Sequence, residues 1–313
     1  MKKLIRYLNQ NRLKIIIIGI IIVFVIILIQ TINGILERAN TDFNTSNVVI
    51  EDTSIPSESV ITGEKLPEET TSANVNIIKQ FVDYANNKDY QSAYNLLTED
   101  CKKEVYSTLD LFIQNYCNKI FNTEKTYNLE LWQYTSNTYT YKVTYIENNI
   151  LETGNINSNS NVEDYITVIE YSAGSKININ NFIEKRNINK AQEQDGIQIT
   201  VNNRYMYTNY EKYSITIKNN LDKTILLSDG LNGNDICLID NNDTEYDSIL
   251  NEIPLINLEI NAGMQKTIEV RFYKMYNLYR TIRSINFRNI ITDKESYELD
   301  SSSVSKLNMR IDI

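Results

Sequence analysis

The chain has 313 residues and a net charge of −9, from 31 basic and 40 acidic residues, and it contains no histidine. Its length suffices for about two domains of ordinary size. The missing histidines remove the most common general base and metal ligand, and an acidic chain is a poor match for nucleic acid. Three cysteines, Cys101, Cys117 and Cys237, form no disulfide framework, so we predict buried free thiols, although Cys101 and Cys117 could pair across two helices.

The N-terminal segment predicts a membrane anchor. Residues 1–14 hold five basic residues and no acid, and form a cytoplasmic basic tip. Residues 15–36 carry no charge and begin with an unbroken apolar run, Ile15–Ile29, long enough for a helix that crosses the bilayer. A cleaved signal peptide is the main alternative, but the stretch from Gln30 to Leu36 offers no small-residue cleavage site. We therefore expect one transmembrane helix, with the remaining chain extracytoplasmic.

Residues 37–73 are predicted to be a disordered acidic stalk. They contain eight acidic and two basic residues, together with many Ser, Thr and Asn and two of the three prolines. Such a segment buries too little apolar surface to offset the entropy of ordering.

Helical periodicity begins at Asn74. Val75, Ile78, Phe81, Val82 and Ala85 form one apolar stripe, which ends at the Asn86-Asn87 turn. Asp89 is the predicted N-cap of a second helix, and Ser107 or Thr108 that of a third, which reaches Ile120. From Thr126 to Ile179 the apolar period changes to two, which predicts a meander of strands.

This region resembles the NTF2-like superfamily, in its extracytoplasmic, membrane-anchored form in low-GC bacteria. The likeness is carried by FVDYANNKDYQSAYNLLTEDCKK, by LDLFIQNYCNKIF and by the strand meander, within residues 74–190. It implies an α+β cone of three helices on a curved antiparallel sheet. Some NTF2-like domains hold an isomerase or dehydratase pocket built from Asp and Tyr, but no named base pairs here with a named electrophile.

The C-terminal part, residues 195–313, is predicted to be all-β. Asn181–Gln194 is polar and is interpreted as a connector, after which seven or eight short strands follow, separated by Asn-, Asp- and Gly-containing turns. This pattern looks like the Ig-like β-sandwich modules of bacterial surface proteins. The expected fold class is thus an NTF2-like cone plus a C-terminal Ig-like sandwich, preceded by one transmembrane helix.

One candidate binding site is a basic, aromatic run, RFYKMYNLYRTIRSINFR, which contains no acid. A local basic patch in an acidic protein suits an anionic wall polymer, a phospholipid head group or an acidic partner. The alternative is that two strands have basic residues on their outward positions. The candidate residues are Arg271, Lys274, Tyr276, Tyr279, Arg280, Arg283 and Arg288.

Two further features have structural interpretations. The 22 tyrosines suit half-buried strand surfaces, although Tyr-rich sheets also bind glycans or peptides. The acidic segment IDNNDTEYD lacks the spacing of an EF-hand loop and is interpreted as a solvated hairpin.

The sequence predicts no catalytic residue, metal or cofactor. It predicts a non-catalytic, single-pass extracytoplasmic binding or assembly protein of the bacterial cell envelope. Its partners would be the lipid bilayer through residues 15–36 and an envelope protein or anionic wall polymer, not nucleic acid. The alternatives are an NTF2-like isomerase or dehydratase, and a surface adhesin that binds wall polymer.

Overall fold

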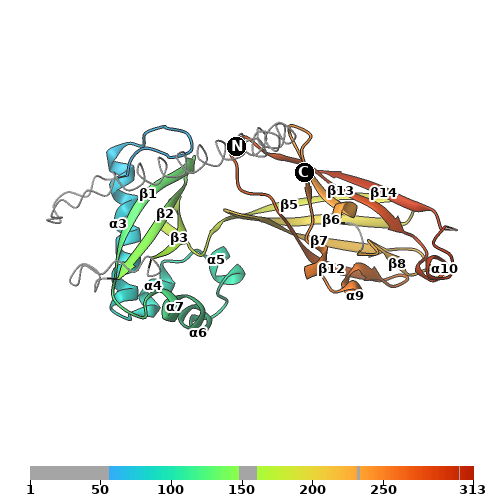
Figure 1. Ribbon diagram of the computed structural model, residues 1–313, viewed down its shortest axis with the longest axis horizontal. Helices are drawn as coiled ribbons and strands as arrows, with labels where there is room; N and C mark the ends of the chain where they lie inside the picture. The colour runs from blue at the N-terminus through green and yellow to red at the C-terminus, as the bar shows by residue number, and fades with distance from the viewer. Residues whose placement is uncertain (1–55, 148–160, 231–232, 303) are drawn as a thin grey trace, which may run out of the picture. The chain divides into compact units, whose positions relative to one another are not determined.

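The computed structural model describes residues 56–147, 161–230, 233–302 and 304–313 (Figure 1). Residues Ile55–Ile313 form one compact unit, and the other unit, Met1–Ser54, lies outside the described residues. The predicted tip, the predicted membrane span at 15–36 and the first part of the predicted stalk therefore lie outside them too. Helix α3 begins at Glu68, inside the range predicted to be stalk. The two acidic residues in its first turn stabilise the helix, because they lie at the positive end of its dipole.

The first part of the compact unit packs helices against one antiparallel sheet. Its helical elements are α3 (Glu68–Asn86), α4 (Tyr90–Asn95), α5 (Glu99–Glu104), α6 (Leu109–Phe112), a π-helical turn (Ile113–Cys117) and α7 (Asn118–Ile120). Its strands, β1 (Lys125–Thr135), β2 (Thr138–Glu147), β3 (Val162–Tyr171) and β4 (Gly174–Asn178), are ordered β1-β2-β3-β4. The predicted N-caps Asp89 and Thr108 are confirmed, because each side chain accepts a hydrogen bond from the third residue that follows it.

The second part consists of two sheets that share a hydrophobic core (Figure 1). One sheet has the order β12-β7-β6-β5 and comprises β5 (Phe182–Gln194), β6 (Ile197–Tyr207), β7 (Glu211–Asn219) and β12 (Gln265–Phe272). The other has the order β10-β9-β13-β8-β11, with β14 paired to β13. Its strands are β8 (Ile225–Leu226), β9 (Ile236–Asp240), β10 (Glu245–Asp247), β11 (Glu259–Ile260), β13 (Ile282–Ile291) and β14 (Lys306–Asp312). Short helical turns lie at Gly233–Asp235, Leu250–Glu252, α9 (Leu255–Leu258) and α10 (Lys294–Leu299).

The expected fold class is wrong. Instead of a helical NTF2-like cone, an Ig-like sandwich and a preceding transmembrane helix, the described residues lie mostly in antiparallel strands of three sheets. None of the described helices is long and apolar enough to cross a membrane. The helix predicted to reach Ile120 is divided into α6, a π-helical turn and α7, and Tyr116 and Cys117 are buried within the π-helical turn.

The segment interpreted as a connector, Asn181–Gln194, is the long strand β5 apart from its first residue. Among the described strands it pairs with β6 alone, at the edge of its sheet, and most of its residues after Glu184 are exposed. An edge strand that is solvated on both faces lacks the alternation of apolar and polar residues that marks a strand in the sequence. The predicted boundary at residues 190–195 therefore falls within a continuous hairpin.

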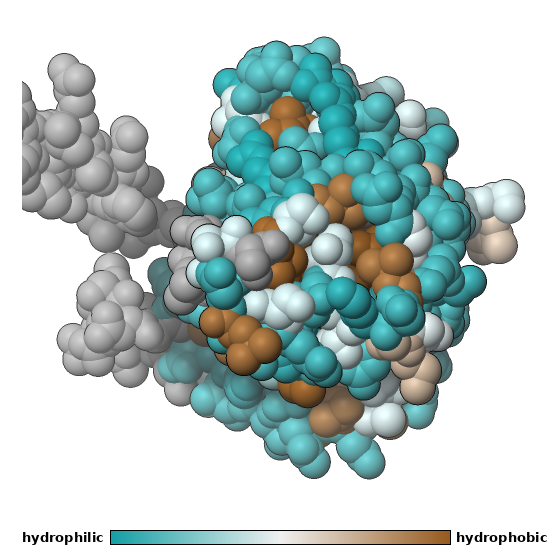
Figure 2. All heavy atoms as spheres, turned by 90° about the vertical axis from the view of Figure 1, so that its right-hand side faces the viewer, coloured by the Kyte–Doolittle hydropathy of each residue, from teal (hydrophilic) through white to brown (hydrophobic). Residues whose placement is uncertain are grey.

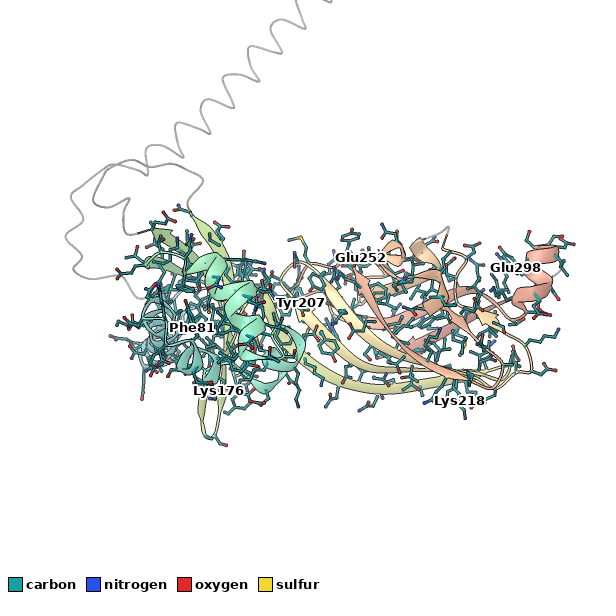
Figure 3. The ribbon with its side chains drawn as sticks, turned by 90° about the horizontal axis from the view of Figure 1, so that it is seen from below. Phe81, Lys176, Tyr207, Lys218, Glu252 and Glu298 are labelled. Atoms are coloured by element: carbon teal, nitrogen blue, oxygen red, sulfur yellow. The ribbon has the colours of Figure 1, made fainter. Side chains whose placement is uncertain are left out.

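The first core is rich in aromatic residues and the second is mostly aliphatic, and the three cysteines are buried free thiols, as predicted. In the first core, Phe112 is fully buried, with its ring centroid 5.6–6.3 Å from those of Phe81, Tyr94, Tyr106 and Tyr116 (Figure 3 labels Phe81). Rings packed at these distances fill the space between them.

Candidate functional site

The predicted basic run covers the end of β12, the loop 273–281 and most of β13. All five cations of the run form ion pairs with carboxylates, at distances of 2.5–3.1 Å. The pairs are Arg271–Glu252, Lys274–Glu211, Arg280–Asp240, Arg283–Asp243 and Arg288–Glu245. The positive charge of the run is therefore balanced by carboxylates within the fold. The sequence contained a sign of this pairing, because the acidic segment interpreted as a hairpin supplies three of these five carboxylates.

The two tyrosines predicted to belong to the binding site differ in their exposure to solvent. Tyr276 is half-buried, and its backbone N–H donates to the carbonyl of Thr208. Tyr279 is 67% exposed. No cluster of three or more metal-ligating side chains occurs in the described part of the chain.

Lys274 belongs to a buried ionic cluster centred on Glu211. The Glu211 carboxylate is fully buried and accepts from Arg204 Nε and Nη2, Lys274 Nζ and the Tyr213 hydroxyl, at 2.6–2.9 Å. Burial would raise the pKa of Glu211, but Arg204 and Lys274 outweigh it and hold the pKa below its ordinary value. The cluster joins the start of β7 to β6 and to the loop 273–281, so its function is to hold these segments together.

Two cavities of about 350 Å³ each lie beside this cluster, and both are lined by Lys212 and Arg271. These two residues lie opposite each other on β7 and β12. The first cavity extends between β12 and the segment 249–257, and the second reaches Glu104, Asn181 and Tyr207. We call the two cavities together the β12 groove; Figure 3 labels Tyr207 and Glu252 on its walls.

The second cavity is bounded by a stack of side chains that leads from the core to the surface. Phe182 contacts Tyr207 at a centroid distance of 5.2 Å, and Tyr207 stacks on Tyr210 at 4.2 Å. The Arg271 guanidinium lies 4.5 Å from the Tyr210 ring. Because Tyr210 stacks on Tyr207 and lies beneath a cation, it is poorly placed to stack on a sugar, and burial raises the pKa of both tyrosine hydroxyls. The stack therefore forms one wall of the second cavity.

The charged side chains of the groove are held by one another. Lys212 Nζ lies 2.5 Å from Glu104 and 3.0 Å from Glu269, and the Tyr207 hydroxyl donates to Glu104. Burial would lower the pKa of Lys212, but these two carboxylates outweigh it and raise the pKa, so the ammonium stays charged. The walls hold two cations, Lys212 and Arg271, and three carboxylates, which leaves a net charge of −1.

One wall of the first cavity is an open strand edge. Along an antiparallel strand, the N–H and C=O groups of alternate residues point to the same side. The Arg271 carbonyl accepts from the N–H of Ile249 on the side away from β7. By this alternation the backbone groups of Glu269 and Thr267 point to the same side, and both residues line the cavity. Neither has a backbone partner on that side among the described residues, so two residues of β12 remain available for strand pairing.

The corner of the second cavity is fixed by a buried aspartate. Asn180 and Asn181 both have a positive φ, and their N–H groups donate to the Asp164 carboxylate at 3.1 and 3.0 Å. The Tyr116 hydroxyl donates to the same carboxylate at 2.7 Å. Asp164 is therefore a positioning residue for the groove. Its oxygens are occupied by fixed donors, which leaves it poorly suited to act as the general base of an isomerase, even though burial raises its pKa.

Sequence reasoning identified part of this site. It named Arg271 as a candidate, and it interpreted the many tyrosines as residues of half-buried strand surfaces; of these, Tyr207 and Tyr213 are buried. It missed Lys212, Glu104 and the open edge of β12. The groove combines segments that are more than 100 residues apart, such as Glu104 and Arg271, and no local pattern indicates that they meet.

Comparison with known proteins adds little to this geometry. No family model matches the chain, and no curated protein matches it. Among solved structures, it is similar to a functionally unknown protein from Listeria monocytogenes EGD-e, with 15% sequence identity and a TM-score of 0.28. That similarity covers 42% of this chain and 87% of the other. Similarity at this level shows neither the fold nor the function of this protein.

Proposed function

We propose that this chain is a non-catalytic binding and assembly protein of the bacterial cell envelope that holds an extended segment of a partner protein along β12. The observation that carries the proposal is the open edge of β12 at Thr267 and Glu269, which faces a cavity of about 350 Å³. An extended peptide that adds a strand to such an edge gains main-chain hydrogen bonds, and neighbouring pockets select its side chains.

The surroundings of the edge suit a peptide better than a polymer of one charge. Lys212, Arg271, Glu252 and Glu269 place both signs of charge along the cavity, with a small net negative charge over the whole groove. Charges of both signs with a net charge of −1 favour a polar segment with a basic side chain, and they disfavour a uniformly anionic chain.

The envelope location depends on the predicted span at residues 15–36, outside the described residues. In that arrangement the basic tip is cytoplasmic, and the groove lies on the extracytoplasmic side, where the protein would assemble with an envelope partner. The alternative of an NTF2-like isomerase or dehydratase is disfavoured by the packed rings around Phe112 and by the occupied carboxylate of Asp164.

Two variants at one position test the strand-addition mode. Glu269→Pro removes the outward N–H, and proline is tolerated where the N–H of an edge strand faces solvent. Glu269→Ala removes the same side chain and retains the N–H. We expect crosslinking capture from native membranes to recover a protein partner with the wild type and with Glu269→Ala. With Glu269→Pro, the amount of partner recovered should fall at least about tenfold.

Equal recovery with both variants would show that no strand is added at this edge. Recovery of wall polymer alone, without a protein, would refute the assembly function and favour the adhesin. Thermal unfolding of both variants serves as the control, since a large loss of stability in Glu269→Pro alone would mean that its N–H is needed within the fold.

A further inference from the structure

A second surface feature lies outside the β12 groove. The loop 273–281, between β12 and β13, is docked at three points: Lys274 binds Glu211, the Tyr276 N–H donates to Thr208, and Arg280 binds Asp240. Three large side chains of this segment are exposed: Tyr273 just before the first of these points, and Met275 and Tyr279 between them. Tyr273 and Met275 are each 70% exposed, and Tyr279 is 67% exposed. A loop that is fixed by a buried ion pair and still exposes three large hydrophobic residues is typical of an interaction surface.

The exposed loop continues onto the first part of the unit. The rings of Tyr276 and Trp132 lie 6.2 Å apart. Trp132 lies at a bulge in β1, where the carbonyls of Leu131 and Trp132 accept from the N–H groups of Val60 and Ile61. Val60 is 63% exposed and Ile61 is 47% exposed.

These residues form a set that we call the apolar strip. Its members are Val60, Ile61, Trp132, Tyr273, Met275, Tyr276 and Tyr279. On the face near α10, hydrophobic residues also gather in several groups among hydrophilic ones (Figure 2).

We propose that the apolar strip rests on the outer surface of the lipid bilayer. The inference depends on the membrane location in the proposed function. The length of chain outside the described unit supports this occupant: 18 residues, 37–54, separate the predicted span from Ile55, and a random-coil chain of 18 residues would reach roughly 20–25 Å. Val60 and Ile61 follow within seven residues. With the predicted span in the bilayer, this length would bring the start of the strip within reach of the membrane surface.

The composition of the strip also fits a bilayer interface. Tyrosine and tryptophan are the residues enriched at the level of the lipid head groups, and methionine, valine and isoleucine add apolar surface that enters the acyl boundary. A glycan would need open aromatic faces and hydrogen-bonding groups, which the aliphatic members do not supply. The nearby cations Arg280 and Arg283 are already paired with Asp240 and Asp243, so the contact should depend on apolar area and only weakly on lipid charge.

The only tryptophan in the chain provides a direct probe, because Trp132 lies within the strip. The full chain is reconstituted in phosphatidylcholine vesicles, with and without lipid that carries a nitroxide near the head group, and Trp132 emission is recorded. We expect the nitroxide lipid to lower the emission, to a similar extent when phosphatidylglycerol is included. The variant Tyr273→Ser/Met275→Ser/Tyr279→Ser should remove most of that loss.

Two matched controls are available on other surfaces. Leu299→Ser on α10 replaces a residue that is 90% exposed, and Tyr171→Ser at the end of β3 replaces one that is 50% exposed. Both controls should retain the quenching. All the replaced side chains are solvent-exposed, so the folding of each variant is checked by its thermal transition.

Each other outcome overturns the inference in its own way. If the chain floats with the vesicles but the nitroxide lipid does not change Trp132 emission, the strip does not touch the bilayer while the anchoring stands. If the chain does not float, the membrane location of the proposed function fails as well. If the triple variant retains the quenching but loses a crosslinked protein or the ability to bind purified wall polymer, the strip belongs to that partner.

Discussion

Replacing Glu211 by glutamine is expected to lower the free energy of unfolding by about 3–5 kcal/mol. The carboxylate is fully buried between Arg204 and Lys274, and Lys274 is itself only 1% exposed. Glutamine retains the shape of the side chain but leaves two cations facing a neutral amide at a buried position. Urea denaturation followed by Trp132 emission measures the loss.

The matched control is Glu252→Gln, at the ion pair with Arg271. Those side chains are 48% and 40% exposed, so this substitution should cost about 1 kcal/mol or less. Equal losses in the two variants would mean that Glu211 and Lys274 are solvated and that the cluster does not hold the loop 273–281.

The same cluster gives stability a defined dependence on pH. The pKa of Glu211 is lowered in the folded protein, so its contribution is fully present above the ordinary value of 4.5 and is lost as the pH falls from there towards the folded pKa. The difference in unfolding free energy between the wild type and Glu211→Gln should therefore be constant near neutral pH and shrink below about pH 4.5. A difference that grows as the pH falls would mean that folding raises the pKa of Glu211 instead of lowering it.

Replacing Phe112 by alanine is expected to cost about 3–5 kcal/mol of unfolding free energy. The ring is fully buried and packs against the rings of Phe81, Tyr94, Tyr106 and Tyr116, so alanine leaves a cavity that these neighbours fill only in part. The adjacent Leu111, 40% exposed, offers a control, since Leu111→Ala should change stability by about 0.5 kcal/mol.

This comparison also bears on the enzyme alternative. If the interior of the first part is packed as described, apolar probes such as benzene should bind to Phe112→Ala and not to the wild type. A wild-type protein that binds such a probe, or that loses little stability in Phe112→Ala, would have an open interior and would restore the isomerase or dehydratase as a candidate.

Local sequence signals predicted local structure well in this chain. The helix caps at Asp89 and Thr108 and the end of α3 at Asn86 depend on a few neighbouring residues, and the structure has them where the pattern placed them. The strand β5 was not predicted, because its sequence carries no such local signal. Its residues after Glu184 are polar because the strand lies at a sheet edge and is solvated, and a polar segment of this kind is indistinguishable from a loop in the sequence.

The candidate site was less predictable because it depends on pairing between distant segments. The basic run from Arg271 to Arg288 reads as an excess of positive charge, yet the strands β9, β10 and β13 bring carboxylates beside its arginines. The open edge of β12 follows from which strands pair and which do not, and strand order is not encoded in the spacing of apolar residues.

Photo-crosslinking from the β12 groove tests the central claim most directly. A photoreactive residue is placed at Asn257, an exposed position that lines the first cavity, in the full chain within its native membrane. The account predicts a covalent adduct with an extended segment of an envelope protein, identified by mass spectrometry, that disappears with Glu269→Pro and persists with Glu269→Ala. An adduct with wall polymer alone, or one equally strong in both variants, would contradict it.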